Sequence, residues 1–235
     1  MAINEYTPRL AAWYDEVMTT GQDYGEIAQQ FHALTNGHRK VLELGIGTGL
    51  FAEQLVQKGY QITGIDFSPA MLAQARKRFN GTVPLLLQNV VDLQLPEQYE
   101  VAVSHQGVWN FTCYPCSFSL ESHLTQIDAN IQGLRKVAQH LLLGGLLVIN
   151  IQVPSRNTKM PVGENAFFIQ NADLHSSNSF VKKDYLIEKD GKLAVYQHCD
   201  YLRLNQSETE DLLTTSGFCP RAVDRNDGFF AFQKF

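Results

Sequence analysis

The stretch VLELGIGTG, residues 41–49, constrains this chain most, because an apolar strand runs directly into three alternating glycines. Gly45 allows a sharp turn off the strand, Gly47 lets a ligand approach the backbone, and Gly49 permits close packing where a helix begins. The apolar residues before the loop predict a buried parallel strand, and residues 50–56 predict an amphipathic helix after it. The pattern therefore predicts a cradle for a nucleotide-like ligand, with a plain strand-to-helix turn as the alternative.

An acidic residue follows the next predicted strand, which covers residues 61–65. Asp66 comes about 20 residues after the first glycine, where a carboxylate can accept hydrogen bonds from a ribose diol. The dinucleotide fingerprint G-x-G-x-x-G would need glycine where this chain has Leu50. The loop also lacks a basic residue for a pyrophosphate, and Glu43 precedes it, which favours a cation. The sequence therefore disfavours a nicotinamide cofactor.

This combination of motifs resembles the class I S-adenosylmethionine-dependent methyltransferases over roughly residues 40–153. The resemblance implies S-adenosylmethionine as the cofactor and an α/β fold, Rossmann-like, whose mostly parallel sheet has seven strands. Helices would cover both faces, the last strand would be antiparallel, and a β-hairpin would be inserted as a cap. It also implies cofactor contacts from the first acid, the glycine loop and the second acid with its following residues, namely Glu43, Gly45, Ile46, Gly47, Thr48, Gly49, Asp66, Phe67 and Met71.

Further cofactor contacts are predicted from two other segments. Tyr14 with the aspartate after it resembles the N-terminal pattern of small-molecule N-methyltransferases, including those acting on amino sugars, where an aromatic covers the cofactor. After a predicted strand at residues 83–88, the adenine-binding acid of the family is replaced by Asn89, with Asp92 three residues further on, and the choice between the two stays open. The backbone amide of Val90 is the candidate partner of adenine N1.

The predicted strand at residues 100–104 ends at the edge where doubly wound sheets bind ligands. Ser104 is therefore a candidate cofactor contact. His105 is the candidate general base because its unperturbed pKa suits that role, and a hydrogen-bonded strand-end histidine is the alternative. His105, Trp109 and Asn110 are also candidate contacts of the methyl acceptor, with Trp109 as a wall of the pocket.

The whole chain, residues 1–235, is expected to be one methyltransferase domain. Residues 154–179 predict a long loop, and residues 180–188 and 193–204 predict a β-hairpin joined by an Asp-Gly turn. This insertion would cover the acceptor, with Tyr196 as a candidate contact, or form a homodimer. Ser207 with Glu210 predicts a helix cap, and residues 218–223 and 229–235 predict a closing antiparallel pair. The expected parts are an N-terminal helical cap (1–39), the cofactor-binding core (40–153), the insertion (154–205) and a closing helix and hairpin (206–235).

Composition narrows the partners. The net charge of −5 and pI near 5.8 provide no basic field for nucleic acid. No apolar run is long enough for a membrane span and no signal peptide is recognisable, so a cytoplasmic protein without a membrane is expected. Cys113 and Cys116 form a single C-x-x-C without further ligands at zinc spacing, which predicts free thiols and no metal.

The predicted function is transfer of a methyl group from S-adenosylmethionine to a nitrogen or oxygen of a small molecule. A direct displacement needs mainly alignment of the acceptor in a dry pocket, and a base is optional. The alternatives are a regulatory module that binds S-adenosylmethionine without catalysis and, less favoured, a nicotinamide-dependent oxidoreductase.

Overall fold

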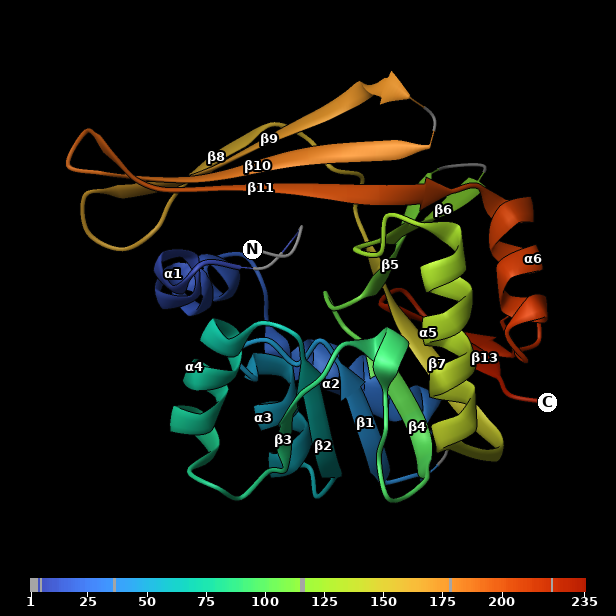
Figure 1. Ribbon diagram of the computed structural model, residues 1–235. Helices are drawn as coiled ribbons and strands as arrows, with labels where there is room; N and C mark the ends of the chain where they lie inside the picture. The colour runs from blue at the N-terminus through green and yellow to red at the C-terminus, as the bar shows by residue number, and fades with distance from the viewer. Residues whose placement is uncertain (1–3, 5, 36, 115–116, 178, 221) are drawn as a thin grey trace.

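The structure of the chain is a computed structural model. It describes residues 4, 6–35, 37–114, 117–177, 179–220 and 222–235. Across these residues 13 strands form one continuous hydrogen-bonded sheet that divides into a central layer and a second layer above it (Figure 1).

The central layer has seven strands in the order β3-β2-β1-β4-β7-β13-β12 over the described residues. Strands β3 to β7 of this order are parallel, whereas β13 runs antiparallel to β7. The α/β fold with a mostly parallel sheet and an antiparallel last strand, predicted from the sequence, is therefore confirmed. The strands of this layer are β1 (Lys40–Leu44), β2 (Gln61–Asp66), β3 (Leu85–Leu87), β4 (Tyr99–Ser104), β7 (Leu141–Gln152), β12 (Asp224–Arg225) and β13 (Phe229–Gln233).

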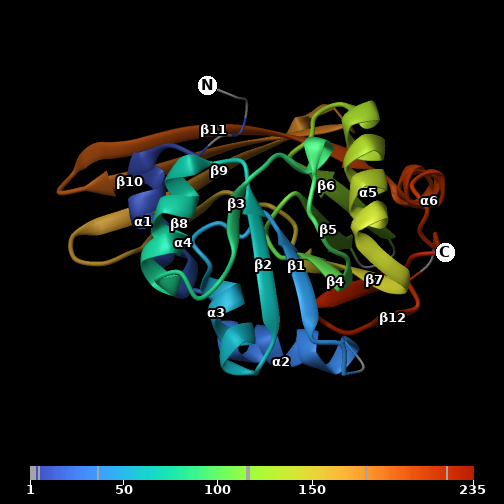
Figure 2. The same cartoon turned by 60° about the horizontal axis from the view of Figure 1, so that its bottom comes forward.

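Side chains of the central strands other than β12 alternate between two hydrophobic cores, one on each face of the sheet. In β1, Leu42 and Leu44 pack with residues of α5 and α6, whereas Val41 packs with residues of α2, α3 and α4. Such two-sided burial explains why these strands are almost continuously apolar. Figure 2 shows α3 and α5 on opposite sides of the strands. The helices are α2 (Tyr24–Leu34), α3 (Leu50–Gln57), α4 (Pro69–Phe79), α5 (Ile127–His140) and α6 (Gln206–Thr215).

The second layer lies above α1 (Pro8–Thr19) in Figure 1. It joins the central layer where β5 pairs with the end of β7, and continues in the order β5-β6-β11-β10-β9-β8. The predicted hairpin is confirmed as β10 and β11, with Asp190 and Gly191 at positive φ in its turn. The strands are β5 (Trp109–Tyr114), β6 (Ser117–Ser122), β8 (Thr158–Pro161), β9 (Ala166–Ser177), β10 (Phe180–Lys189) and β11 (Lys192–Leu204).

The prediction of a long loop over residues 154–179 was wrong, because β8 and β9 occupy most of that segment. Their polar residues suggested a loop, but an antiparallel sheet can keep one face solvated, and β9 is fixed by its register against β10. The β5–β6 hairpin was not predicted either.

Three smaller features also differ from the sequence prediction. The cap of α6 is Asn205 with Glu208, not Ser207 with Glu210, since Asn205 accepts from the backbone N–H of Glu208 and the Glu208 carboxylate accepts from that of Asn205. Among the described residues of 218–223 only Phe218 makes a β-bridge, an isolated antiparallel one to Lys234, so the closing pair of strands is β13 with the two-residue β12. Strand β3 is shorter than residues 83–88.

Cys113, Cys199 and Cys219 are free thiols, whereas Cys116 of the C-x-x-C lies outside the described residues. The described part of the chain contains no cluster of three or more metal-ligating side chains. None of its helices is long and apolar enough to cross a bilayer. The homodimer and the internal boundaries of the domain stay predictions.

Candidate functional site

The glycine loop packs against the segment that follows β4. Gly45, Gly47 and Gly49 have φ of 75°, 59° and 87°, in the left-handed region that glycine adopts without strain. A Cβ on Gly107, after β4, would lie 2.0 Å from the carbonyl oxygen of Leu44, and a Cβ on Gly45 would lie 2.9 Å from Cα of Gly107. The two loops therefore touch backbone to backbone, which brings the ends of β1 and β4 together.

Asp66, at the end of β2, holds the glycine loop in place. Its Oδ2 accepts from the backbone N–H of Gly47 at 2.8 Å, and its Oδ1 accepts from that of Ser68 at 2.8 Å. Burial raises the pKa of Asp66 to about 6, although these backbone hydrogen bonds oppose the shift. Each carboxylate oxygen has a second lone pair, so the side chain can still accept from a ligand hydroxyl.

A cavity of about 130 Å³, here called the glycine-loop cavity, opens beside Asp66. Asp92 is exposed and does not line it, whereas Asn89 does, while also accepting from the backbone N–H of Val91 at 3.2 Å. Of the two residues left open by the sequence, Asn89 is therefore the one placed to contact a ligand. The predicted cofactor contacts that line this cavity are Tyr14, Gly45, Gly47, Asp66, Phe67, Met71, Asn89 and Val90.

Other predicted cofactor contacts shape the loop without lining the cavity. The side chain of Ile46 packs over Gly64, and Gly49 lies against the ring of Phe79. Thr48, between Gly47 and Gly49, is buried. Ser104 is fully buried, and its Oγ bonds to both the backbone N–H and the carbonyl of Trp109, at 3.0 and 2.8 Å.

Glu43 is a buried carboxyl that no side chain neutralises. It is 1% exposed, and among the described residues its Oε2 has no hydrogen-bond partner. Burial, and then the nearby Asp66, raise the pKa of Glu43 well above its usual range. Glu43 is not among the residues that line the glycine-loop cavity, although it lies near enough to Asp66, which does line it, for the two carboxyls to repel each other. An orphaned carboxyl here would be stabilised by a cationic ligand.

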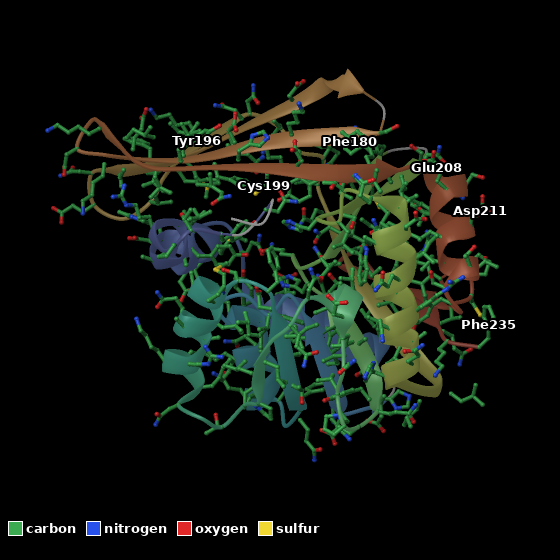
Figure 3. All side chains as sticks on the ribbon, viewed as in Figure 1. Phe180, Tyr196, Cys199, Glu208, Asp211 and Phe235 are labelled. Atoms are coloured by element: carbon green, nitrogen blue, oxygen red, sulfur yellow. The ribbon has the colours of Figure 1, made fainter. Side chains whose placement is uncertain are left out.

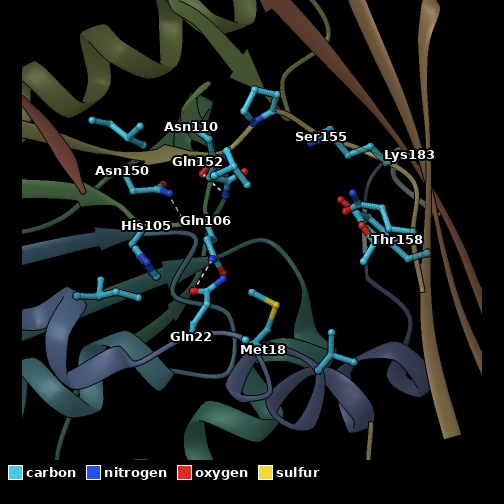
Figure 4. A pocket seen from close by; sticks show the side chains of 18 of the residues that line it. Met18, Gln22, His105, Gln106, Asn110, Asn150, Gln152, Ser155, Thr158 and Lys183 are labelled. Atoms are coloured by element: carbon cyan, nitrogen blue, oxygen red, sulfur yellow. Dashed lines mark hydrogen bonds between the residues drawn. The ribbon is translucent and has the colours of Figure 1, made fainter. Parts of the chain in front are cut away.

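A second cavity of about 550 Å³ adjoins the first, lying between the central sheet, α1 and the second layer. Here we call it the second cavity (Figure 4). Tyr6, Tyr14, Gln106 and His123 line both cavities, so the two meet at these side chains. Gln106 adopts φ of 51°, which is uncommon for a residue with a side chain, and such backbone strain is often found at functional sites.

Two histidines line the second cavity, and both are kept neutral by burial. His105 is 7% exposed, with its ring 4.5 Å from that of Phe51 and 5.7 Å from that of Tyr24. Burial lowers its pKa to about 3. The pKa of His123 is also lowered to about 3, by burial and then by Lys183. Its Nδ1 is buried without a hydrogen-bond partner in the described structure.

Behind His123 lies a buried ion-pair cluster of one acid and two bases. Lys183 Nζ donates to Glu121 Oε2 at 2.9 Å, and Arg203 Nη2 donates to Glu121 Oε1 at 3.2 Å. The side chains of Lys183 and Glu121 are only 6% and 1% exposed. Burial, the largest influence, raises the pKa of Glu121, but the two cations together hold it below its usual range.

Two predicted acceptor contacts do not line either cavity. Trp109 is fully buried in the core, where its Nε1 donates to Asn130 Oδ1 at 2.7 Å, so it supports the sheet instead of walling a pocket. Tyr196 is 54% exposed and donates to Asp184 Oδ1, on the face of the second layer opposite to Cys199 (Figure 3). Asn110 and His105 do line the second cavity.

Sequence reasoning missed several residues that the fold brings to the cavities. Asn150 and Gln152 interrupt the apolar strand β7 with period 2, a signal that could have revealed a polar strip. His123 gave no such signal, because it reaches Tyr6 only through the packing of segments that lie far apart in the chain.

Comparison with known proteins extends these observations. Residues 41–145 match the family described as Methyltransferase domain. A malonyl-[acyl-carrier protein] O-methyltransferase of Bacillus cereus is 32% identical over 114 residues, which are 47% of this chain and 36% of that protein. The chain spans from 20% to 56% of the length of the curated relatives it matches.

Solved structures resemble nearly the whole chain. The sugar N-methyltransferase KedS8 from Streptoalloteichus sp. aligns with a TM-score of 0.72 over 94% of this chain and 92% of its own, at 18% identity. CalS10, an amino pentose methyltransferase from Micromonospora echinaspora determined with bound S-adenosylmethionine, aligns with a TM-score of 0.69 over 100% of both chains, at 17% identity. At these identities the likeness establishes the fold.

Proposed function

We propose that this chain, which has the class I S-adenosylmethionine-dependent methyltransferase fold and matches the methyltransferase domain over residues 41–145, transfers a methyl group from S-adenosylmethionine to the amine of a small molecule. The observation that carries the proposal is the meeting of the two cavities at Tyr6, Tyr14, Gln106 and His123. One cavity has the glycine loop and the acid of a nucleoside site, and the other has room for a small acceptor.

The residues of the glycine-loop cavity fit the cofactor. Asp66 can accept hydrogen bonds from a ribose diol, and Asn89 with the backbone of Val90 can bind the adenine. The orphaned Oε2 of Glu43 suits a ligand that carries positive charge, as S-adenosylmethionine does. When bound, S-adenosylmethionine supplies an activated methyl group on a sulfonium. Tyr14 and Tyr6 would shield that group from water at the junction.

The two histidines favour nitrogen over oxygen as the attacking atom. A hydroxyl acceptor benefits more than an amine from a general base whose pKa lies near the working pH, but the pKa of His105 and that of His123 are both lowered to about 3. An amine can lose its proton to water before it binds. We therefore assign His105 to the wall of the second cavity and not to proton abstraction. The names of KedS8 and CalS10, a sugar N-methyltransferase and an amino pentose methyltransferase, support an amine acceptor.

Charge supports a small molecule as the acceptor. The chain has a net charge of −5, which gives no field to attract a polyanion such as nucleic acid. The second cavity, at about 550 Å³, is in the size range of small-molecule sites.

Release of S-adenosylhomocysteine in the presence of S-adenosylmethionine and a panel of primary amines, alcohols and phenols tests the proposal. We expect turnover with amines and none with phenols. Turnover restricted to phenols or alcohols would contradict the choice of nitrogen. Binding of S-adenosylmethionine without turnover on any acceptor would favour the non-catalytic module instead.

A pH profile tests the role assigned to the histidines. With an amine acceptor, kcat/KM should rise with pH through the pKa of the amine itself, because only the neutral amine attacks. His105→Leu should leave the position of that rise unchanged, because a group with a pKa near 3 does not titrate between pH 6 and 9. A rise centred near pH 6.5 that disappears in His105→Leu or His123→Leu would identify that histidine as the base.

A further inference from the structure

Five carboxamide side chains gather on one side of the second cavity, facing Lys183 and Thr158 across it (Figure 4). They come from separate segments of the chain: the α1–α2 connection, the loop after β4, and strands β5 and β7. Asn150 and Gln152 lie two residues apart on β7, so they point to the same face. Strand β5 runs parallel beside that end of β7, which brings its carboxamide alongside. The five residues, here called the carboxamide wall, are Gln22, Gln106, Asn110, Asn150 and Gln152.

Each carboxamide is oriented by a hydrogen bond to another part of the wall. Gln106 Nε2 donates to Gln22 Oε1 at 2.8 Å, and the backbone N–H of Gln106 donates to Asn150 Oδ1 at 2.9 Å. Gln152 Nε2 donates to Asn110 Oδ1 at 3.2 Å. Asn110 and Asn150 are only 4% and 3% exposed, so their orientation is fixed by packing as well.

The other end of each carboxamide is left for a ligand. In the described structure no hydrogen bond uses Nδ2 of Asn110, Nδ2 of Asn150 or Oε1 of Gln152, and none of these atoms is sealed from solvent. A carboxamide offers both N–H donors and carbonyl lone pairs without net charge. The wall therefore presents unused donors and acceptors side by side on two adjacent strands, roughly 5 Å apart between strands and 7 Å along one.

The carboxamide wall itself contains no charged side chain, which argues against an anionic substituent as the group that it binds. Among the described lining residues of the second cavity, Lys183 is already paired with Glu121, and Arg156 and Asp227 are exposed. A group that both donates and accepts hydrogen bonds while remaining uncharged is a hydroxyl. Several hydroxyls on one ring would match several carboxamides.

We infer that the carboxamide wall binds the hydroxyl groups of the acceptor, so that the acceptor is a polyhydroxylated amine and Asn110, Asn150 and Gln152 determine its selection. This inference rests on the proposed function, because it is methyl transfer that requires the amine to point toward the junction of the two cavities at Gln106. A site built to bond a substrate hydroxyl rejects an analogue without it far more strongly than an apolar pocket rejects an extra methylene.

Calorimetric titration of the protein saturated with S-adenosylhomocysteine tests the inference without requiring turnover. The probes are methyl 3-amino-3-deoxyhexopyranoside and 4-aminotetrahydropyran, which keeps the ring and amine but lacks the hydroxyls. With dissociation constants expressed for the neutral amine, the hydroxylated probe should bind about 100-fold more tightly, as expected for several net hydrogen bonds. Equal affinity, or no binding of the hydroxylated probe, would overturn the inference.

Substitutions in the carboxamide wall test whether its side chains cause the difference in affinity between the two probes. Gln152→Met and Asn110→Leu should each weaken the hydroxylated probe about 10-fold and leave the hydroxyl-free probe and S-adenosylhomocysteine unaffected. Gln57→Met, an exposed position outside both cavities, is the matched control and should change nothing. If both wall variants weaken the two probes equally, the wall does not read hydroxyls.

The outcomes separate this inference from the proposed function. In one outcome the hydroxylated amine binds and its binding depends on the wall, but no S-adenosylhomocysteine is released from S-adenosylmethionine. This would support the role of the wall in binding hydroxyls and reject methyl transfer to that amine. Turnover only on amines without hydroxyls would support methyl transfer and reject the role of the wall in binding hydroxyls.

Discussion

Replacing Glu121 by alanine is expected to lower the free energy of unfolding by about 3–5 kcal/mol, because Lys183 and Arg203 would be left without their buried counter-charge. This loss of stability is expected because two cations are left buried without a counter-charge. The attraction within the ion pairs is not its main source. Urea unfolding followed by circular dichroism measures it. The matched control is Glu188→Ala in the exposed pair with Lys159, which should change stability by about 1 kcal/mol or less.

Lowering the pH should remove the contribution that Glu121 makes to the free energy of unfolding. The pKa of Glu121 is lower in the folded protein than in the unfolded chain, so its contribution is complete above the unfolded value of about 4.3 and is lost as the pH falls through the folded value. The difference between wild type and Glu121→Ala should therefore shrink below about pH 4. The triple variant Glu121→Leu, Lys183→Met, Arg203→Met should recover most of the stability. A cost below 1 kcal/mol for Glu121→Ala would show that the two cations are solvated.

Replacing Glu43 by glutamine is expected to have opposite effects on stability and on cofactor binding. The ligand-free protein should gain about 1–3 kcal/mol at neutral pH, since burial disfavours the ionised form of Glu43 and the amide of glutamine carries no charge. Binding of S-adenosylmethionine should weaken by about 10- to 150-fold, the range for losing a hydrogen bond to a charged group. Thermal unfolding and calorimetry of the same preparation measure the two effects.

The pH dependence gives Glu43→Gln a second signature. The pKa of Glu43 is raised on folding, so the unfolded chain releases this proton at lower pH, and wild-type stability should fall as the pH rises above about 4.3. Part of that fall persists in the variant because the pKa of Asp66 is also raised, to about 6. Glu97→Gln, at a half-exposed carboxylate, is the control and should alter neither property. Unchanged affinity in Glu43→Gln would remove Glu43 from the cofactor site.

Local sequence patterns predicted the central layer and the glycine-loop cavity because the determining residues lie close together in the chain. Gly45, Gly47 and Asp66 fall within two strands and one turn, and their side chains or φ angles are fixed by that unit. Ser68 caps α4, and Pro69 occupies the first turn of that helix, a combination typical of helix starts. Here the geometry follows from strand, turn and helix rules that a single sequence displays.

The second layer and the acceptor side of the site could not be predicted from local patterns, because they depend on pairings between segments that are distant in the chain. The polar residues of β9 predict a loop, whereas its pairing with β10 and β8 makes the segment a strand. Trp109 is an aromatic residue of the kind expected in the wall of the acceptor pocket. Its indole instead donates to Asn130 of α5 and lies in the core. His123 and Lys183 meet Tyr6 and Tyr14 only after β6, β10 and α1 have packed, which no local pattern encodes.

Calorimetric titration with S-adenosylmethionine and S-adenosylhomocysteine, with NADH as control, tests the central claim most directly. We expect one equivalent of each of the first two to bind to the wild type and NADH not to bind. Asp66→Ala should weaken binding about 10- to 150-fold, because the carboxylate proposed to accept from the ribose is lost. Binding of NADH without either adenosyl compound, or unchanged affinity in a folded Asp66→Ala, would contradict the assignment of the glycine-loop cavity.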